Sequence, residues 1–551
     1  MDVRYLLLFF LFNAALDSYV NGAIPPCDSE IYCTGPILHQ VQKAKLYDDD
    51  KYFVDMKLRE APDVVLAAFR NLTMEWPNAT VPPVQLQQFL SSYFEKPGTE
   101  FEEWTPPDWH DKPSFLEGIT DGKLRLWAEK IHQLWKQLGR KVMSNHPELY
   151  SQIYTPHPVV VPGGRFRELY YWDSYWVING LLLSEMRDTA HGMIQNFLYL
   201  VNRYGFIPNG GRIYYERRSQ PPFLTLMVES ISRHTLIPHS NTHVSGTLHV
   251  LNHYYVHVGL PRPESYTDDL ELAEGLSDEQ TEQLWMDLKS GAESGWDFSS
   301  RWYVSDHGPN NTLKDTRTSH FVPSDLNALL CRNEKTLASF HRLDSATLYE
   351  QAAARRMEAM EALLWDDERG AWFDFNLLTH TKNIEFYPSN LAPVWAQCYS
   401  TAEMGEKAVQ YLKTSGGLQF PNGVPTSLSQ SGQQWDYPNA WPPLQHMLIH
   451  GFSKLESEDA QELAFDLAQR WIGTNWLAYE KYEAMFEKYD VNGDGKPGGG
   501  GEYEVQLGFG WTNGVALQLL DQYGSRLTSG SRGLCSGFLL PLLISADLVF
   551  L

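Results

Sequence analysis

The chain has 551 residues, which leaves room for a large core and, on length alone, for several domains. Its formal net charge is -24 at pH 7, and a chain this acidic repels phosphate backbones and anionic membranes, which argues against nucleic acid as a partner. Aromatic residues make up 13% of the chain, with 18 tryptophans, a bias that favours carbohydrate or aromatic ligands.

The N-terminal segment, residues 1–23, predicts a secretory signal peptide. Arg4 precedes an apolar run at residues 5–11, which is too short to cross a bilayer. Small residues follow, and we expect cleavage near Gly22 or Ala23. A single folded domain is then expected over residues 24–525.

The cysteines agree with export to an oxidising compartment. Cys27 and Cys33 lie six residues apart behind the expected cleavage site, and we expect them to form a small disulfide loop. Cys331 and Cys398 lie in apolar helical contexts, so they are predicted to be buried thiols. Cys535 is expected to leave with the C-terminal tail.

Three sequons also fit an exported glycoprotein. They lie at Asn71, Asn78 and Asn310. The sequence has no CxxC pair, HExxH motif or histidine cluster, so no metal site is predicted. The stretch Asp490–Gly495 imitates the start of an EF-hand, but Gly501 occupies the twelfth position where a glutamate is needed, so calcium is not expected.

Helices dominate the predicted elements. A first helix starts at residues 62–69, whereas residues 77–113 are rich in proline and tryptophan and are predicted to form a wrapping loop with short helical turns. Two strand-like pieces are expected at 212–215 and 372–376. The remaining helices are expected at 124–145, 188–203, 224–231, 242–258, 278–294, 324–340, 345–365, 404–413, 441–452, 459–482 and 511–523.

Several helix starts share one pattern, an aromatic residue followed by a short polar group. Such starts serve as N-caps, and their number suggests helical hairpins arranged around a ring with the caps on one rim. An all-α toroid is therefore the predicted fold class. The starts are at 172–173, 321–325, 387–390, 435–439 and 509–513.

The C-terminal segment, residues 526–551, predicts a GPI-anchor signal. Small residues around Ser529 and Gly530 are followed by a hydrophobic tail at 538–551. Ser529 is the expected attachment residue, which would place the protein on the extracellular face of the cell membrane. Asp547 interrupts the tail, and a tail-anchored end is the alternative.

Residues 162–176 combine a Pro-Gly-Gly turn with a dense mixture of rings, arginines and carboxylates. Pyranose faces stack on tryptophan and tyrosine, whereas sugar hydroxyls pair with arginine donors and carboxylate acceptors. An ordinary loop leading into a core helix would explain the apolar run that follows but not these charges. The stretch therefore predicts a sugar-binding site.

Four motifs carry a family resemblance: residues 162–175, 293–302, 434–443 and 498–503. The motif at 162–175, PGGRFRELYYWDSY, and the motif at 434–443, QWDYPNAWPP, resemble the two signatures of the trehalases, glycoside hydrolase family thirty-seven. The resemblance covers about residues 25–523. It implies an (α/α)6 barrel with long loops on one rim, hydrolysis of α,α-trehalose to two glucose molecules with inversion, and no cofactor.

Inverting hydrolysis requires one protonated and one ionised carboxyl group. Asp297 lies between Trp296 and Phe298, where apolar neighbours raise a carboxyl pKa, and Glu502 follows four glycines that act as a hinge. The resemblance implies that Asp297 is the general acid and Glu502 the general base. From the residues alone, three other carboxylates remain rivals: Asp173, Glu168 and Glu504.

The resemblance also implies a set of substrate-binding residues. Alternatives remain open, because Arg262 can simply pair with Glu264, and Asn209 can be a turn residue. The implied set is Arg165, Trp172, Asp173, Asn209, Arg218, Ser219, Gln220, Arg262, Pro263, Glu264 and Gly295.

Two other functions stay open at this point. The residues define a sugar cleft better than one particular disaccharide, so an inverting hydrolase for another α-glucoside is an alternative. A catalytically silent sugar-binding surface protein is the second, although the presence of both Asp297 and Glu502 argues against it.

Overall fold

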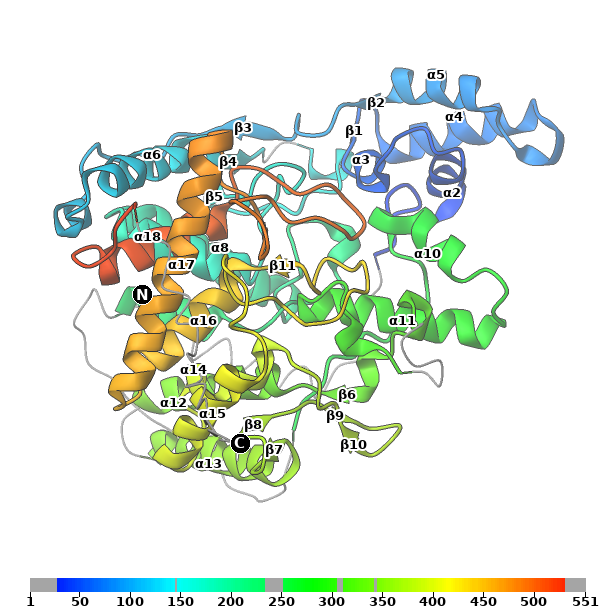
Figure 1. Ribbon diagram of the computed structural model, residues 1–551. Coiled ribbons are helices and arrows are strands. Elements are labelled where there is room, and N and C mark those ends of the chain that lie inside the picture. The colour runs from blue at the N-terminus through cyan, green and yellow to red at the C-terminus, as the bar shows by residue number, and fades with distance from the viewer. Residues whose placement is uncertain (1–26, 144–145, 233–250, 305–310, 341–343, 531–551) are drawn as a thin grey trace, which may run out of the picture.

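The computed structural model describes residues 27–143, 146–232, 251–304, 311–340 and 344–530 (Figure 1). The expected signal peptide at 1–23, the sequon at Asn310, Cys535 and the tail from residue 531 lie outside the described residues.

Helices form a closed ring, which confirms the predicted all-α toroid. Within the described residues, six inner helices pack against one another in the order α7, α9, α12, α14, α16 and α18, and α18 returns to α7. Six further helices alternate with them along the chain and complete the (α/α)6 arrangement. The inner helices are α7 (Asp173–Leu183), α9 (Leu224–Ser232), α12 (Ser324–Phe340), α14 (Ala392–Ala396), α16 (Pro442–Phe452) and α18 (Gly510–Tyr523). The alternating helices are α6 (Gly122–Leu138), α8 (Arg187–Tyr204), α11 (Asp278–Ser294), α13 (Asp344–Leu363), α15 (Ala402–Thr414) and α17 (Glu458–Tyr482).

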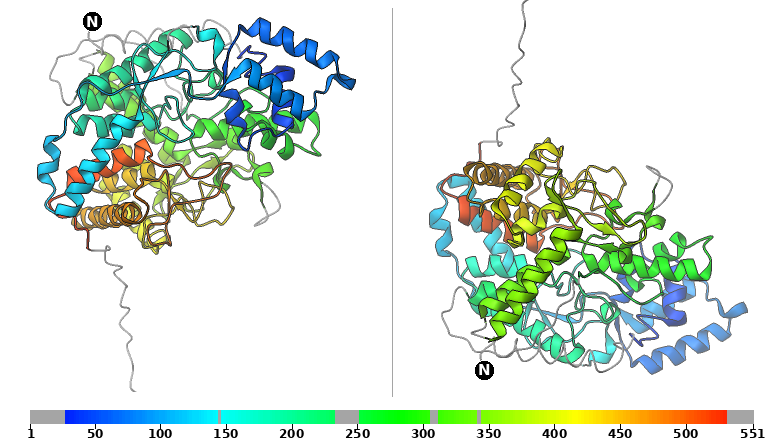
Figure 2. Two further views of the ribbon diagram at one scale, coloured as in Figure 1. Left: turned by 90° about the horizontal axis from the view of Figure 1, so that it is seen from above. Right: turned by 90° about the horizontal axis from the view of Figure 1, so that it is seen from below.

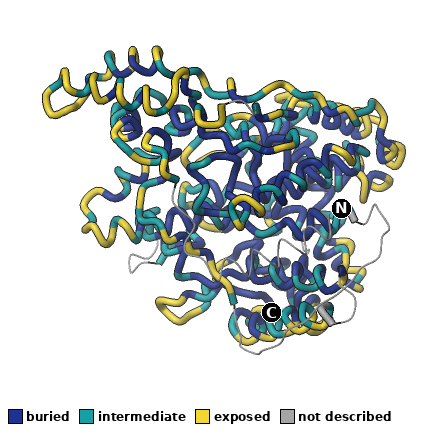
Figure 3. Tube along the Cα trace, turned by 180° about the vertical axis from the view of Figure 1, so that it is seen from behind, coloured by how far each residue is buried: buried dark blue, intermediate teal, exposed yellow. Residues whose placement is uncertain are grey.

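The inner helices are buried on nearly every side, as Figure 3 shows for the centre of the molecule. Helix α7 is apolar around most of its circumference, which suits a helix enclosed by neighbours. It crosses α18 at a pair of glycines, where a Cβ added to Gly180 would lie 2.9 Å from the Cα of Gly514. Glycine at these positions therefore allows the two backbones to touch.

A separate N-terminal lobe packs beside the ring. It contains α2 (Gly35–Lys43), α3 (Asp50–Val54), α4 (Pro62–Met74) and α5 (Pro83–Tyr93), which share their own apolar core. Figures 1 and 2 show this lobe in blue at one side of the helical body, next to the short helix α10 (Tyr266–Leu272). The lobe is closed by the disulfide that was predicted between Cys27 and Cys33, with Cα atoms 6.0 Å apart.

Strands are short and antiparallel. Two of the small sheets have three strands, in the orders β3-β4-β5 and β10-β9-β6, and the others are pairs. The strands are β1 (Lys57–Leu58) with β2 (Phe94–Glu95), β3 (Phe101–Glu103) with β4 (Gly139–Val142) and β5 (Val159–Val160), β6 (Phe321–Val322) with β9 (Phe375–Asn376) and β10 (Thr381–Lys382), β7 (Trp365–Asp366) with β8 (Ala371–Trp372), and β11 (Asn439–Ala440) with β12 (Tyr489–Asp490).

Several expected elements differ from the structure. The helix expected at 124–145 ends at Leu138, because residues 139–142 pair with β3 and β5. Residues 77–113 are not only a loop, since they contain α5 and β3. Residues 212–215 form no hairpin, and 213–215 make a 3-10 turn.

The helix expected at 242–258 is wrong over its described part, residues 251–258. Side chains replace the helical hydrogen bonds there. The amide of Asn252 donates to Asn327 Oδ1 at 2.8 Å, and the amide of Val256 donates to Ser290 Oγ at 3.0 Å. Residues 242–250 lie outside the described residues.

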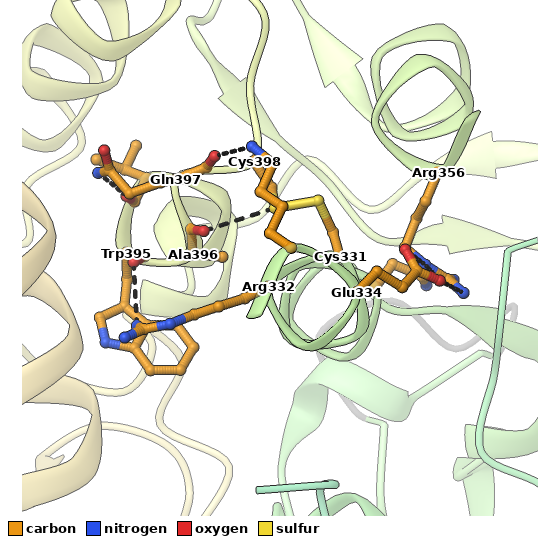
Figure 4. Close-up of a disulfide and its surroundings, with 11 residues drawn as sticks. Cys331, Arg332, Glu334, Arg356, Trp395, Ala396, Gln397 and Cys398 are labelled. Atoms are coloured by element: carbon orange, nitrogen blue, oxygen red, sulfur yellow. Dashed lines mark hydrogen bonds and ion pairs between the residues drawn. A yellow bond between two sulfur atoms is a disulfide. The ribbon is translucent and has the colours of Figure 1, made fainter. Parts of the chain in front are cut away.

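The prediction that Cys331 and Cys398 are free thiols is also wrong. They form a disulfide with Cα atoms 6.3 Å apart, and Figure 4 shows it between α12 and the end of α14. The two helices are neighbours in the inner ring, so the fold brings together cysteines that are 67 positions apart. Beside the bond, Arg332 lies 4.4 Å over the ring of Trp395.

Candidate active site

A pocket opens where several inner helices begin. Residues at or just before the first turns of α7, α16 and α18 line it, which agrees with the prediction that helix starts gather on one rim. The lining residues are Arg165, Phe166, Tyr170, Trp172, Asp173, Asn209, Tyr215, Arg218, Gln220, Arg262, Glu264, Ser265, Ala292, Gly295, Asp297, Trp435, Trp441, Glu487, Glu502, Tyr503, Phe509 and Trp511.

Nearly all of the residues singled out from the sequence meet in this pocket. Two do not line it. Ser219 donates its hydroxyl to the carbonyl of Ile207 at 2.6 Å and its amide to Glu293 Oε1 at 3.0 Å. Pro263 accepts a hydrogen bond from Gln42 Nε2 at 3.1 Å through its carbonyl. Both residues therefore hold the backbone next to a lining residue.

Asp297 is placed by the end of α11 and by the second signature. Helix α11 ends at Gly295, whose φ of 76° is a left-handed conformation that suits glycine. The carbonyl of Asp297 accepts from Gln434 Nε2 at 2.5 Å, and the amide of Trp435 donates to the Phe298 carbonyl at 3.0 Å. The two motifs, far apart in sequence, thus fix one short loop.

The environment of Asp297 favours its protonated form. Burial and then the negative charge of Glu502 raise its pKa to about 7. Arg218 and Arg262 act in the opposite direction but do not outweigh the burial. The sequence argument for a raised pKa is therefore supported by the same physical cause, an apolar surrounding.

Glu502 is held as an ion-paired carboxylate. Arg262 donates to its two oxygens at 2.7 and 3.3 Å, and Ser265 Oγ donates to Oε2 at 3.1 Å. Its side chain is 21% exposed. The preceding Gly500 and Gly501 have φ values of 78° and 82°, which glycine adopts without strain.

Glu487 is a second carboxylate in the pocket, and the sequence reading missed it. It is 1% exposed, and burial raises its pKa. Tyr503 donates its hydroxyl to Oε1 at 2.9 Å, and Lys488 Nζ lies 3.7 Å from Oε2. Glu487 follows Phe486 directly, and this aromatic-flanked carboxylate is the signal that could have revealed it.

Asp173 is another buried carboxylate of the pocket. It begins α7 and is 5% exposed. Burial raises its pKa well above the usual range, and the charges of Glu487 and Asp297 add to that effect. Asp173, Asp297 and Glu487 therefore form an acidic group that shares one pocket, named here the pocket carboxylates.

The arginines of the pocket are each bound to a carboxylate. Arg218 donates to Glu264 Oε1 at 2.7 Å and lies 4.7 Å over the ring of Tyr215. Arg262 pairs with Asp269 at 2.7 Å in addition to Glu502. Such pairs fix the guanidinium planes while leaving some N–H donors for sugar hydroxyls.

Tryptophans form an apolar wall. Trp435 and Trp441 stack with ring centroids 4.0 Å apart and an interplanar angle of 2°. Trp172 packs edge-on against Trp511 at 5.7 Å. A Cβ added to Gly295 would lie 2.9 Å from the Trp172 ring, so glycine lets that ring lie flat against the chain. The wall suits the face of a pyranose ring.

A family model described as Trehalase matches residues 45–243 and 236–524. The chain belongs to the trehalase family. It is 52% identical to the trehalase of Homo sapiens, with 99% of this chain and 97% of that protein covered. It is 53% identical to the trehalase of Oryctolagus cuniculus, with 92% of each covered. Among solved structures, neutral trehalase from Saccharomyces cerevisiae matches with a TM-score of 0.52 and 27% identity, covering 66% of this chain and 73% of that one.

Two of the rival carboxylates do not line the pocket of this trehalase-family chain. Glu168 is fully buried, and its pKa is about 2, because burial is outweighed by the charges of Lys51 and Arg212. Glu504 is exposed on the loop after Glu502. Asp173 remains in the pocket, as described above.

Several pocket residues had no prediction attached to them individually. Five of them lie inside the motifs that carried the resemblance, so the motifs themselves pointed to these, and six lie outside. They are Phe166, Tyr170, Trp435, Trp441 and Tyr503 within motifs, and Tyr215, Ser265, Ala292, Glu487, Phe509 and Trp511 outside them.

Metal and membrane features can be stated for the described residues. They contain no group of three His, Cys, Asp or Glu side chains able to hold a metal ion. Within the EF-hand-like stretch, Asp490 Oδ1 accepts hydrogen bonds from Asn492. None of the helices in the described part of the chain has the length and apolar character needed to cross a bilayer.

Proposed function

We propose that this trehalase-family hydrolase cleaves α,α-trehalose to two glucose molecules by a single-displacement, inverting mechanism. Asp297 is the general acid that protonates the glycosidic oxygen. A second carboxylate removes a proton from water on the opposite side of the sugar. The observation that carries the proposal is a carboxyl group with a pKa of about 7, set in a tryptophan-walled pocket beside other carboxylates.

Two carboxylates compete for the role of base. The resemblance assigns it to Glu502, and that assignment stays a prediction. Both oxygens of Glu502 accept hydrogen bonds from Arg262, so this carboxylate is held in an ion pair. Burial raises the pKa of Glu487, and its ion pair with Lys488 is longer, at 3.7 Å, than the 2.7 Å contact between Arg262 and Glu502. A base is more effective when its pKa approaches the working pH, so the contacts favour Glu487.

Two matched variants decide between these bases. Glu487→Gln and Glu502→Gln change the same group in the same pocket. If Glu487 is the base, Glu487→Gln loses turnover and azide restores part of it by replacing the water. Glu502→Gln would then raise KM more than it lowers kcat. The reverse pattern would assign the base to Glu502.

Proton NMR of fresh products tests the reaction itself. Inverting cleavage of α,α-trehalose releases equal initial amounts of α- and β-glucose, because only one ring changes configuration. Maltose and sucrose serve as parallel substrates. Faster release from either would favour a hydrolase for another α-glucoside, and no release from any of them would favour a silent sugar-binding protein.

Location is a separate proposal, and it rests on sequence patterns. We propose that residues 1–23 direct export, that Asn71, Asn78 and Asn310 carry glycans, and that residues 526–551 direct a lipid anchor at Ser529. Asn71 and Asn78 are exposed on the N-terminal lobe, as a glycan requires. Release from cells by phosphatidylinositol-specific phospholipase is the expected result, and retention after treatment would contradict the anchor.

Ser529 lies at the end of the described chain. Its amide and hydroxyl donate to Asp121 Oδ2 at 2.8 and 2.9 Å. Asp121 is the N-cap of α6, so the C-terminal segment is tied to the ring up to the proposed attachment residue. An anchor there would leave the enzyme close to the membrane surface.

A further inference from the structure

The N-terminal lobe contacts two walls of the pocket from outside. Asp49 and Asp50 are consecutive residues at the start of α3, and each accepts hydrogen bonds from a different wall. We propose that both are positioning residues: Asp49 orients the guanidinium of Arg165, and Asp50 fixes the turn that holds Glu502. The inference rests on the proposed function, because the site that they complete is the proposed trehalose pocket.

Asp49 binds Arg165 with both oxygens. Arg165 Nε donates to Oδ2 at 2.8 Å, and Nη2 donates to Oδ1 at 2.6 Å. Among the described residues, Asp49 is the one carboxylate ion-paired with Arg165. The pair occupies two of the five N–H donors of the guanidinium, so the others remain for a sugar hydroxyl. Asp49 therefore sets the direction in which these donors point.

The backbone of Arg165 is held in a turn, because its amide donates to Gln506 Oε1 at 2.8 Å and the backbones of Gly163 and Phe166 exchange hydrogen bonds at 3.1 and 3.2 Å. The end of its long side chain needs a restraint of its own. Its guanidinium lies 4.7 Å over the ring of Tyr503, which restrains its height but not its rotation. The bidentate carboxylate supplies the missing restraint.

Asp50 acts on a second part of the pocket lining. Its Oδ2 accepts from the amide and the hydroxyl of Thr267, both at 2.6 Å. Gln42 Nε2 bridges the carbonyls of Asp50 and Pro263, at 2.8 and 3.1 Å. Ser265, in the same turn, donates to Glu502. The lobe thus reaches Glu502 through a chain of three contacts.

A purely structural role makes a different prediction. The Asp49 side chain is 39% exposed and that of Arg165 is 17% exposed. Ion pairs with this much solvent contribute little to folding, about 0–1 kcal/mol. If the pair matters, its effect should therefore be seen in substrate binding and not in thermal stability.

Asp49→Ser is the sharpest test. Asp49 also caps α3 by accepting from the Lys51 amide at 2.9 Å, and serine keeps that cap while losing the ion pair. We expect KM for trehalose to rise about tenfold, with kcat changed by less than about threefold and Tm by less than about 2 °C. Asp48→Asn, an exposed carboxylate one position earlier, is the control and should match the wild type.

A double-mutant cycle separates positioning from a general effect. In an Arg165→Ala background, Asp49→Ser should add little, because the group that it orients is gone. Additive effects, an unchanged KM in the single variant, or a fall in Tm without a change in KM would each overturn the proposal.

Calorimetry keeps the inference separate from the reaction. Trehalose binding is measured in Asp297→Asn with and without Asp49→Ser, and Kd should rise about tenfold as KM does. Failure of the wild type to release glucose would contradict the proposed reaction alone, because this binding comparison still tests Asp49. Equal Kd values would contradict the role of Asp49.

Asp50→Ala tests the second wall. The turn at 263–265 should loosen, and the change should resemble Ser265→Ala, with a smaller rise in KM than Asp49→Ser gives. If the double variant Asp50→Ala with Ser265→Ala raises KM no more than the stronger of the two single variants, both residues act on Glu502 through the same path. Additive losses in the double variant would contradict it.

Discussion

Two clusters of carboxylates in this molecule differ in the pKa of their members. The first, named here the lobe cluster, joins the N-terminal lobe to the ring through Lys51, Asp55, Glu100, Glu168 and Arg212, whose side chains are at most 2% exposed. The second is the pocket carboxylates Asp173, Asp297 and Glu487. Burial opposes ionisation in both.

Cations explain the difference. Glu168 lies 2.8 Å from Lys51 Nζ and 3.1 Å from Arg212 Nε, and its pKa is about 2. The arginines near Asp297 are already paired with Glu264, Asp269 and Glu502. A buried carboxylate in close contact with two cations stays ionised, whereas burial raises the pKa where no cation is so close, as for Asp297 and for Glu487, whose ion pair with Lys488 measures 3.7 Å.

Asp297→Asn should give the largest effect. The amide has nearly the same shape but cannot donate a proton to the leaving oxygen, so kcat should fall by about 10³–10⁴-fold. Glucose release and the thermal transition are measured on the same preparation. A loss of fold together with activity would show that Asp297, like the lobe cluster, has a structural role.

Glu168→Gln should affect stability instead. The change leaves Lys51 and Arg212 with fewer buried counter-charges, and breaking a buried pair costs about 3–5 kcal/mol. Denaturant unfolding measures the loss. The comparison would be broken if stability stayed the same while KM rose. Lys141→Gln, which breaks an exposed pair with Glu102, is the matched control and should cost at most about 1 kcal/mol.

Gly295→Ala should give a moderate effect. Its φ is 76°, and the added methyl would press on the Trp172 ring, so strain of about 1–2 kcal/mol is expected. The ring must shift, and KM should rise about tenfold. Steady-state kinetics checks this, with Gly205→Ala as control, because Gly205 is also left-handed but has open space at its Cβ. If both variants had the same kcat and KM, the conclusion that Trp172 contacts the substrate would be contradicted.

The pH dependence of kcat/KM should show the smallest effect for each pH unit. The acid must be protonated, so kcat/KM should fall about tenfold per unit above the pKa of Asp297, about 7. If an Asp297 variant with residual activity showed the same fall in kcat/KM at high pH, that fall would come from the titration of another group.

Stability should respond to pH with opposite signs in the two clusters. The folded pKa of Asp297 is raised from 3.8 to about 7, so between these values the carboxyl group is ionised in the unfolded chain but protonated in the folded one. The contribution of Asp297 to stability therefore falls as the pH rises from about 4 to about 7. Asp297→Asn should gain stability relative to the wild type over that window. The folded pKa of Glu168 is lowered from 4.5 to about 2, so its contribution is present above 4.5 and is lost as the pH falls toward 2.

The sequence by itself determined most of the helices and pointed to the sugar chemistry. Apolar spacing located α11 and α12 at 278–294 and 324–340, and the aromatic helix starts pointed to one rim, because these signals act within a few neighbouring residues. The motifs likewise brought Arg165, Asp297 and Trp435 to attention before any contact was known.

Only the tertiary structure decided which carboxylate has a cation. Local sequence does not show that Lys51 reaches Glu168 across 117 positions, whereas none of the cations in the described residues forms an ion pair with Asp297. The same holds for Cys331 with Cys398, and for Asp49 with Arg165. Charge pairing and cross-links depend on distances that the packed ring and lobe set, and local sequence does not encode those distances.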